Sequence, residues 1–153
     1  MLTAHVEGGA FGEVYRSELT LPREVLTPEH NGTRNAMTSI YFLLQEGEFS
    51  ALHRIASDEL WHHYDGDTLC IYEILPDGSL RKHLLGTVDG TMPFVVIKAG
   101  SWFGSRVEEK DGYTLCGCTV APGFDFADFE LADRAALTAA YPSHEAIITE
   151  LTR

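Results

Sequence analysis

The sequence has few cysteines and no long apolar run, and both shortages limit the classes of protein to consider. Its 3 cysteines, Cys70, Cys116 and Cys118, are an odd number, and the last two alternate on an expected strand, where they cannot easily bridge each other. No stretch approaches the roughly 20 apolar residues that span a bilayer, and no basic segment followed by an apolar one opens the chain. We therefore expect free thiols, no membrane association and a cytoplasmic location.

Basic residues are also scarce. Lys and Arg number 11 against 23 Asp and Glu, so the net charge is -12. A charge of this sign repels phosphate backbones and anionic lipid, which argues against sequence-independent binding to nucleic acid or to a membrane surface. A local basic pocket is compatible with this balance, and the expected partner is a small-molecule ligand.

Low-complexity tracts, internal repeats and linkers are absent from the sequence. The length of 153 residues is typical of one domain with one buried core, and a hydrophobic content of 44% is that of a globular protein. We therefore expect residues 1–153 to form a single domain.

Glycine and proline separate many short apolar runs, a pattern that favours an all-β sandwich or barrel. Pro76-Asp77-Gly78 is a tight-turn signal that predicts a hairpin between the runs on either side of it. The expected strands are Gly12–Thr20, Thr38–Gln45, Phe49–His53, Glu59–Tyr64, Leu69–Leu75, Leu80–Leu85, Phe94–Ile97, Ser101–Val107 and Thr114–Val120.

The C-terminal part of the sequence has helical features instead. Asp133 is a suitable cap for a helix that runs through Ala139 and that Pro142 closes. Ser143 is a suitable cap for a second short helix with its apolar residues on one face. We therefore expect short helices at the C-terminus of the β-domain.

The most informative polar cluster lies between residues 53 and 64. Side chains alternate faces along a strand, so Glu59, Trp61 and His63 should point the same way. His53, which arrives from the preceding strand, can join them in one cavity. A β-bulge in this strand would turn His62 into the cavity in place of His63, because one extra residue reverses the alternation of side chains. Both histidines are therefore candidates for the site. Burying these groups together costs free energy unless they bond each other or a ligand, which favours a binding pocket.

The spacing of this cluster carries a family resemblance. Between Gly47 and Gly66 the chain fits G-x5-H-x-I-x3-E-x6-G, which resembles the first motif of the cupin superfamily, with His53 and Glu59 in place. Further runs resemble a family of small single-domain cupins without a firmly assigned reaction: Glu7–Phe11, Tyr15–Ser17, Ala36–Leu44, Ser57–His62 and Gly117–Leu131. The resemblance implies a cupin jelly-roll β-barrel and a homodimer.

The metal ligands that the resemblance implies are incomplete here. A typical metallocupin offers three histidines and one glutamate, but Ile55 stands where the second histidine would be and Phe103 where the third would be. Only His53 and Glu59 remain, whereas a firm transition-metal site generally needs three or four protein ligands. We expect no metal cofactor. In the alternative, His62 or His63 supplies a third ligand to a divalent metal.

Acid–base chemistry does not need a metal. A histidine such as His53, positioned by a carboxylate such as Glu59, is a suitable general base or acid, and Tyr41 is an opposing acid if its strand faces inward. Trp61 offers a flat apolar face to a sugar ring, and Asp125 can reach the pocket mouth. This arrangement is similar, at the level of fold, to metal-free cupins that epimerise deoxy-sugar nucleotides.

We therefore expect a small-molecule-binding cupin with a polar-aromatic pocket for a carbohydrate-like ligand and metal-independent isomerase or epimerase chemistry. Two other classes stay open: a non-catalytic ligand-binding protein, and a metallocupin oxidoreductase with an incomplete ligand set. Several features are interpreted as structural. Cys116 and Cys118 are small residues on a strand, and Glu7-Gly8-Gly9 lacks the strand-then-helix setting of a phosphate-binding loop. Lone histidines are expected at the surface: His5, His30, His83 and His144.

Overall fold

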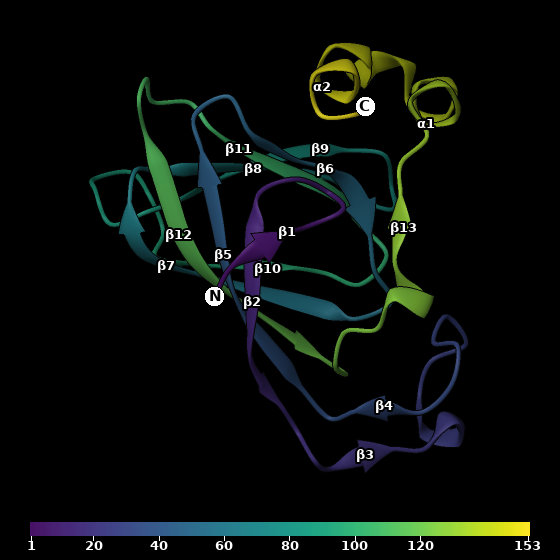
Figure 1. Cartoon of the computed structure of the whole chain (residues 1–153). Helices are drawn as coiled ribbons and strands as arrows, with labels where there is room; N and C mark the ends of the chain where they lie inside the picture. The colour runs from purple at the N-terminus through teal and green to yellow at the C-terminus, as the bar shows by residue number, and fades with distance from the viewer.

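A computed structural model describes all 153 residues and contains two facing antiparallel β-sheets with short helices beside one of them (Figure 1). The six-stranded sheet has the order β1 (Thr3–Ala4), β2 (Ala10–Arg16), β5 (Thr38–Gln45), β12 (Tyr113–Ala121), β7 (Asp58–Gly66) and β10 (Phe94–Ile97). The five-stranded sheet has the order β13 (Glu130–Leu131), β6 (Phe49–Arg54), β11 (Trp102–Val107), β8 (Leu69–Ile74) and β9 (Leu80–Leu85). The predicted all-β fold with C-terminal helices is confirmed.

A two-stranded ribbon of β3 (Thr20–Leu21) and β4 (Arg34–Asn35) extends from the end of the molecule opposite the helices (Figure 1). The expected strand Gly12–Thr20 is wrong in its bounds, since β2 covers Ala10–Arg16 and Thr20 belongs to β3. The sequence pattern did not predict β4, β1 or β13, because two residues are too few to show a periodicity. The predicted hairpin is confirmed: β8 and β9 pair, and Gly78 takes φ +84° in the turn between them.

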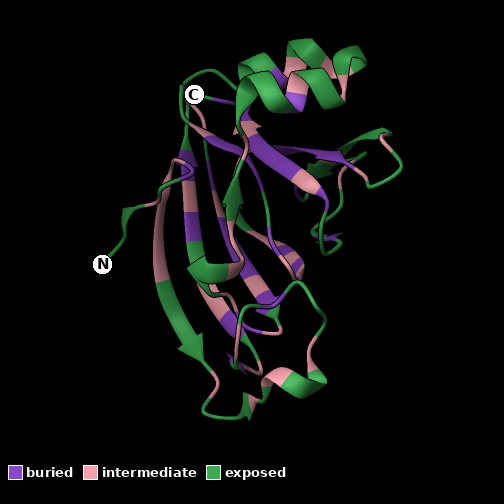
Figure 2. Ribbon diagram, turned by 90° about the vertical axis from the view of Figure 1, so that its right-hand side faces the viewer, coloured by how far each residue is buried: buried purple, intermediate pink, exposed green.

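The main core lies between the two sheets, where alternate side chains of each strand meet. Phe42, Leu44, Trp61, Ile71 and Phe103 are all almost completely buried there. A second apolar cluster lies on the other face of the five-stranded sheet, which the helices cover. Figure 2 shows the result as buried positions that alternate with more exposed ones along many strands, and as helices exposed on their outer sides.

The C-terminal helices are α1 (Arg134–Ala140) and α2 (Glu145–Glu150). The predicted cap of the first is confirmed, since Asp133 accepts a hydrogen bond from the backbone N–H of Ala136 at 2.8 Å. The predicted Ser143 cap is wrong: the short 3-10 helix η3 (Pro142–His144) contains this residue, and α2 begins after it without a side-chain cap. The fixed φ of proline suits the first position of such a turn.

All three cysteines are free and buried. None of the helices is both long enough and apolar enough to cross a membrane. His30 was expected at the surface but is 1% exposed and contacts Ser57. His83 and His144 are partly exposed, and they contact Glu73 and the carbonyl oxygen of Gly78. The fourth, His5, lines a cavity between the sheets.

Candidate functional site

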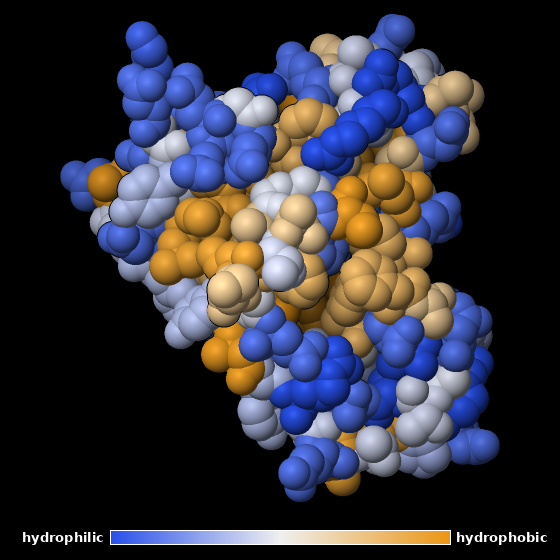
Figure 3. Space-filling model, viewed as in Figure 1, coloured by the Kyte–Doolittle hydropathy of each residue, from blue (hydrophilic) through white to orange (hydrophobic).

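A cavity of about 290 Å³ opens between the two sheets. Hydrophobic residues gather across the middle of the corresponding face, around a hollow between hydrophilic borders (Figure 3). The structure places four of the predicted site residues on the cavity wall, namely His53, Glu59, Trp61 and Asp125. Their catalytic or binding roles stay predictions.

One side of the cavity is built around the carboxylate of Glu7. Its Oε2 lies 3.3 Å from His5 Nδ1 and 3.3 Å from His53 Nε2, while its Oε1 accepts a hydrogen bond from Ser50 Oγ at 2.8 Å. The other ring nitrogen of His53 lies 2.7 Å from the carbonyl oxygen of Ala51, which fixes the ring. We expected Glu59 to contact His53, but the carboxylate that contacts it is Glu7.

Two glycines place Glu7 against strand β6. Gly8 and Gly9 adopt φ +114° and +69°, which turn the chain between β1 and β2. A Cβ on Gly8 would lie 2.1 Å from the carbonyl oxygen of Phe49, so only glycine lets the turn approach this closely. The backbone then forms a hydrogen bond from Ala51 N–H to the Glu7 carbonyl at 2.7 Å. The E-G-G sequence therefore brings a carboxylate to the histidine of β6.

The environment of Glu7 favours its ionised form. Burial opposes ionisation, but the Coulombic effect of His53 and the contacts with His5 and Ser50 together outweigh it, so the pKa of Glu7 is lowered. We therefore expect a carboxylate at this position at neutral pH.

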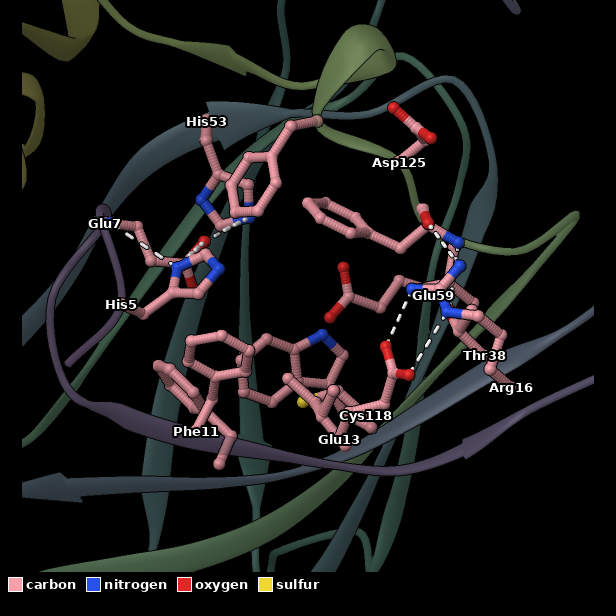
Figure 4. A pocket seen from close by; sticks show the side chains of 16 residues that line it. His5, Glu7, Phe11, Glu13, Arg16, Thr38, His53, Glu59, Cys118 and Asp125 are labelled. Carbon is pink, nitrogen blue, oxygen red and sulfur yellow. Dashed lines mark hydrogen bonds and ion pairs between the residues drawn. The ribbon is translucent and has the colours of Figure 1, made fainter. Parts of the chain in front are cut away.

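Glu59 enters the same cavity from the opposite side, and its carboxyl group points towards the middle (Figure 4). Burial raises its pKa, the negative charge of Glu7 raises it further, and a hydrogen bond with the Cys118 thiol opposes them, so the pKa reaches about 8. At neutral pH Glu59 therefore carries a proton. The cavity thus holds one carboxylate that can accept a proton and one carboxylic acid that can donate one.

The mouth of the cavity carries exposed charges. Arg16 donates to both carboxylate oxygens of Glu13, at 3.1 and 2.7 Å, and to the side-chain oxygen of Asn35 at 2.9 Å. Asp125 also lines the mouth and caps the short helix η2 (Phe126–Asp128) through the N–H of Ala127. The guanidinium is consequently engaged by the protein itself.

Aromatic rings form most of the apolar wall. Trp61 is 1% exposed and makes edge contacts with Phe42 and Phe103 at ring-centroid distances of 5.7 and 6.4 Å. Its Nε1 is buried and has no hydrogen-bond partner in the protein. Buried indole N–H groups usually have a partner, so this donor is left unsatisfied by the protein alone.

Tyr41 does not face the cavity. Its neighbours Ile40 and Phe42 line the pocket, so the alternation along β5 turns Tyr41 to the outer face of the sheet. There it is 45% exposed, with its ring edge against Tyr64. The inward orientation that an opposing acid would need is therefore not met.

The two adjacent histidines also lie outside the cavity. His63 follows Trp61 on the inner face of β7, but its Nε2 contacts the carbonyl oxygen of Asp67, beyond the end of the pocket. His62 faces outward and packs on Phe94 at 4.9 Å. The irregular register between β7 and β12 comes after His63, so no bulge exchanges the two side chains.

Sequence reasoning missed His5 and Glu7, and it left open whether Arg16 faces the cavity. Glu7 and His53 are far apart in the chain, and only the packing of the two sheets against each other brings them together. The signal that was available was the E-G-G-x-F run at Glu7–Phe11, whose glycines require a special backbone next to a charged side chain.

The residues present do not fit the metal centre that the cupin resemblance implies. Ile55 and Phe103, at two of the four ligand positions, are buried hydrocarbon, and the ring of Phe103 lies 4.1 Å from that of His53. No group of three or more His, Cys, Asp or Glu side chains is arranged to hold a metal ion. The side chains of this pocket therefore offer acid–base groups and not the ligand set of a metallocupin.

Comparison with known families decides the classification. A family model described as "Cupin superfamily (DUF985)" matches residues 1–132. The chain belongs to this family. The predicted cupin jelly roll is confirmed, and the description of the family carries no reaction.

Two solved structures share the fold over nearly the whole chain. A hypothetical protein from Leishmania major has a TM-score of 0.90 and 36% identity, with 99% of this chain and 93% of that chain covered. A protein from Shewanella oneidensis has a TM-score of 0.87 and 42% identity, with 99% and 91% covered. A cupin 2 domain-containing protein from Halorhodospira halophila, at 14% identity, TM-score 0.57 and coverage of 99% and 87%, shares the fold.

One curated relative matches part of the chain. A probable serine/threonine-protein kinase from Arabidopsis thaliana is 33% identical over 87 residues, which are 56% of this chain. The match spans 23% of that protein's length.

Proposed function

We propose that this cupin binds a small carbohydrate-like molecule in the cavity between its sheets and moves a proton on it without a metal. The observation that carries the proposal is the pair of buried carboxyl groups, Glu7 and Glu59, which line one cavity and whose neighbours shift their pKa values in opposite directions. A pair of titratable groups whose pKa values are driven apart is the usual basis for assigning an acid and a base.

The reaction class is isomerisation or epimerisation beside a carbonyl. Glu7, held by His5 and His53, takes the proton from the carbon next to the carbonyl, and Glu59 gives its proton to the carbonyl oxygen. The product of this step is a neutral enediol. Glu7 then gives its proton to the former carbonyl carbon while the Glu59 carboxylate takes the proton of the other hydroxyl, which gives the isomer and restores both groups. If the enediol turns over in the cavity, Glu7 returns its proton to the opposite face of the original carbon and Glu59 recovers its proton from the former carbonyl oxygen, which gives the epimer.

The wall of the cavity suits such a ligand. The indole of Trp61 and the rings of Phe11 and Phe42 offer flat apolar surface to the C–H face of a sugar ring, while the carboxyl groups can bond its hydroxyls. The same wall would serve a ligand-binding protein without turnover, so exchange of a carbon-bound proton separates the two classes.

Incubation with common aldoses and ketoses in deuterated water, followed by mass spectrometry, tests the reaction. We expect deuterium to enter at the carbon beside the carbonyl of at least one sugar. Glu7→Gln and Glu59→Gln should each lower the rate of exchange about 10²–10⁴-fold, because each removes one proton-transfer group. Glu130→Gln, which changes an exposed carboxylate paired with Arg54, is the matched control and should keep the rate. If a sugar binds but none of its carbon-bound protons exchanges with deuterium, the protein is a ligand-binding protein and the proposed catalysis is contradicted.

We also propose that two copies of the chain pair through the outer face of the six-stranded sheet. A row of register partners crosses this face from Tyr41 through Gly117 and His62 to Phe94. Tyr41, Phe94 and the adjacent Tyr64 are 45%, 42% and 53% exposed. Exposed aromatic side chains gathered on one sheet face are typical of an interface, and a self-complementary sheet face is compatible with a two-fold homodimer.

A further inference from the structure

The arginine at the mouth of the cavity and the Glu7 carboxylate deeper inside already have partners within the protein. At the mouth, Arg16 is paired with Glu13 and also donates to Asn35. At the floor, the Glu7 carboxylate contacts two imidazoles. Introducing a further charged group would require an unpaired counter-charge, because burying an uncompensated ion costs several kcal/mol.

The electrostatics of the cavity disfavour an anionic ligand most strongly. Arg16 is the only lysine or arginine on the wall, and three carboxylates line it besides Glu59, namely Glu7, Glu13 and Asp125. A phosphate at the guanidinium would compete with Glu13, which holds it through two hydrogen bonds. The net charge of -12 on the whole chain also repels anions at longer range.

A cationic ligand also lacks a free partner at the floor. The carboxylate of Glu7 is already in contact with His5 and His53, and Glu59 carries its own proton at neutral pH. Since neither an anionic nor a cationic ligand finds a free counter-charge beside Glu7 and Glu59, we expect an uncharged ligand.

The buried part of the cavity wall contains an unsatisfied hydrogen-bond donor. Trp61 is almost fully buried on the cavity wall, and its Nε1 donor has no partner in the protein. An oxygen of a ligand hydroxyl or carbonyl is the complementary group. The cavity, at about 290 Å³, lies just below the range of about 300–1,000 Å³ that is usual for ligand pockets, which favours a single-ring ligand over a nucleotide-linked one.

Building on the proposed function, we propose that the cavity takes an uncharged, single-ring polyhydroxy compound, one of whose oxygens accepts a hydrogen bond from Trp61 Nε1. Phosphorylated and nucleotide-linked forms of the same ring are excluded by Glu7, Glu13 and Asp125. The ligand class therefore differs from the sugar nucleotides that the fold-level similarity suggested.

Binding of matched pairs tests the ligand class. The probes are common aldohexoses, aldopentoses and their ketose isomers, each measured beside its terminal phosphate ester by isothermal titration calorimetry. We expect at least one free sugar to bind and its phosphate ester to bind at least about tenfold more weakly, a difference of about 1.4 kcal/mol. In Glu13→Gln, which frees Arg16, this discrimination should shrink.

The proposed hydrogen bond from Trp61 Nε1 to the sugar can be tested separately by NMR spectroscopy. The chain has 2 tryptophans, and Trp102 does not line the cavity, so Trp102→Phe leaves Trp61 as the only indole signal. The Nε1–H resonance of Trp61 should move when the sugar binds. Trp61→Phe keeps an aromatic ring and removes the donor, so it should weaken binding about tenfold, as loss of one hydrogen bond does, with circular dichroism as the folding control.

The outcomes separate this inference from the proposed function. A phosphate ester that binds as tightly as its free sugar, or an indole resonance that stays fixed on binding, overturns the inference and leaves a carbohydrate-binding pocket intact. If neither member of any pair binds, the carbohydrate function itself fails, and the ligand class with it.

Discussion

At the scale of single residues, the site depends on two carboxyl groups that the fold treats differently. Glu7 receives contacts from two imidazoles and a hydroxyl, while Glu59 has the thiol of Cys118 as its partner and lies in the negative field of Glu7. Burial acts on both groups, so the neighbours decide which one keeps its proton. This difference turns two similar side chains into a base and an acid.

The raised pKa of Glu59 predicts a pH dependence of stability. Below its ordinary value of 4.5 the group is protonated in both states, and above about 8 it is ionised in both. Between these values only the folded chain holds the proton, so stability falls as the pH rises, by on the order of 1 kcal/mol per pH unit. Glu59→Gln cannot titrate. Urea unfolding at pH 5 and pH 8 should show the wild type losing stability relative to this variant, and parallel curves for the two proteins would contradict the assignment.

Residue-scale reasoning from sequence succeeded where one strand was enough and failed where two segments had to meet. His53, Glu59 and Trp61 were placed correctly because alternation along neighbouring strands fixes their face. Tyr41 was a candidate only if it faced inward, and that condition is not met, because the inward face of β5 could not be read from its apolar run. His5 was missed because its partner, Glu7, stands in a turn without a secondary-structure signal.

At the scale of elements, the β3–β4 ribbon is attached to the wall of the cavity. Arg34 of β4 donates two hydrogen bonds of 2.6 Å to the carboxylate of Asp128, and both side chains are 5% exposed. Asn31 donates to the same carboxylate and to the carbonyl of Ala127. Asp128 ends the short helix η2, which directly follows Asp125 at the mouth, so the ribbon holds this part of the mouth in place.

Breaking this attachment should cost stability. Arg34→Ala leaves the Asp128 carboxylate buried without its ion partner, and we expect a loss of about 3 kcal/mol in the free energy of unfolding. The matched control is Arg54→Ala, which breaks the exposed pair with Glu130 and should cost less than about 1 kcal/mol. Guanidinium unfolding of both variants measures the difference. Equal losses would show that the ribbon contributes no more than a surface contact.

Elements were more predictable than their contacts. The bounds of β5, β9 and β10 agree with the sequence pattern, because their apolar runs lie between clear turn residues. The start of α2 was wrong because Pro142 begins a 3-10 turn that competes with a cap at Ser143. The attachment of the ribbon to η2 has no sequence signal, since Arg34 and Asp128 are distant in the chain.

At the scale of the whole molecule, the two faces of the six-stranded sheet have different roles. The inner face carries the cavity wall, and the outer face carries exposed aromatic residues where a soluble sheet usually carries polar ones. The family match accounts for the fold, whereas the ligand depends on side chains that the fold alone does not fix.

The proposed homodimer is tested by charge on the outer face. Phe94→Glu should dissociate the dimer, because it places a charge in an apolar interface. The matched control is Val88→Glu, at a residue that is 63% exposed and lies outside the register row. Light scattering coupled to size-exclusion chromatography should give a dimer for the wild type and the control, and a monomer for Phe94→Glu. A wild-type monomer would contradict this interface.

The protonation states of Glu7 and Glu59 are measured most directly by a ¹³C NMR titration of protein labelled at the glutamate carboxyl carbons. Glu7→Gln and Glu59→Gln assign the two resonances. We predict that the Glu59 resonance titrates with a midpoint near pH 8 and that the Glu7 carboxyl is ionised below its ordinary value of 4.5. If the Glu59 resonance titrates near pH 4.5, both groups are carboxylates at neutral pH, and the cavity has no acid to complete the proton transfer.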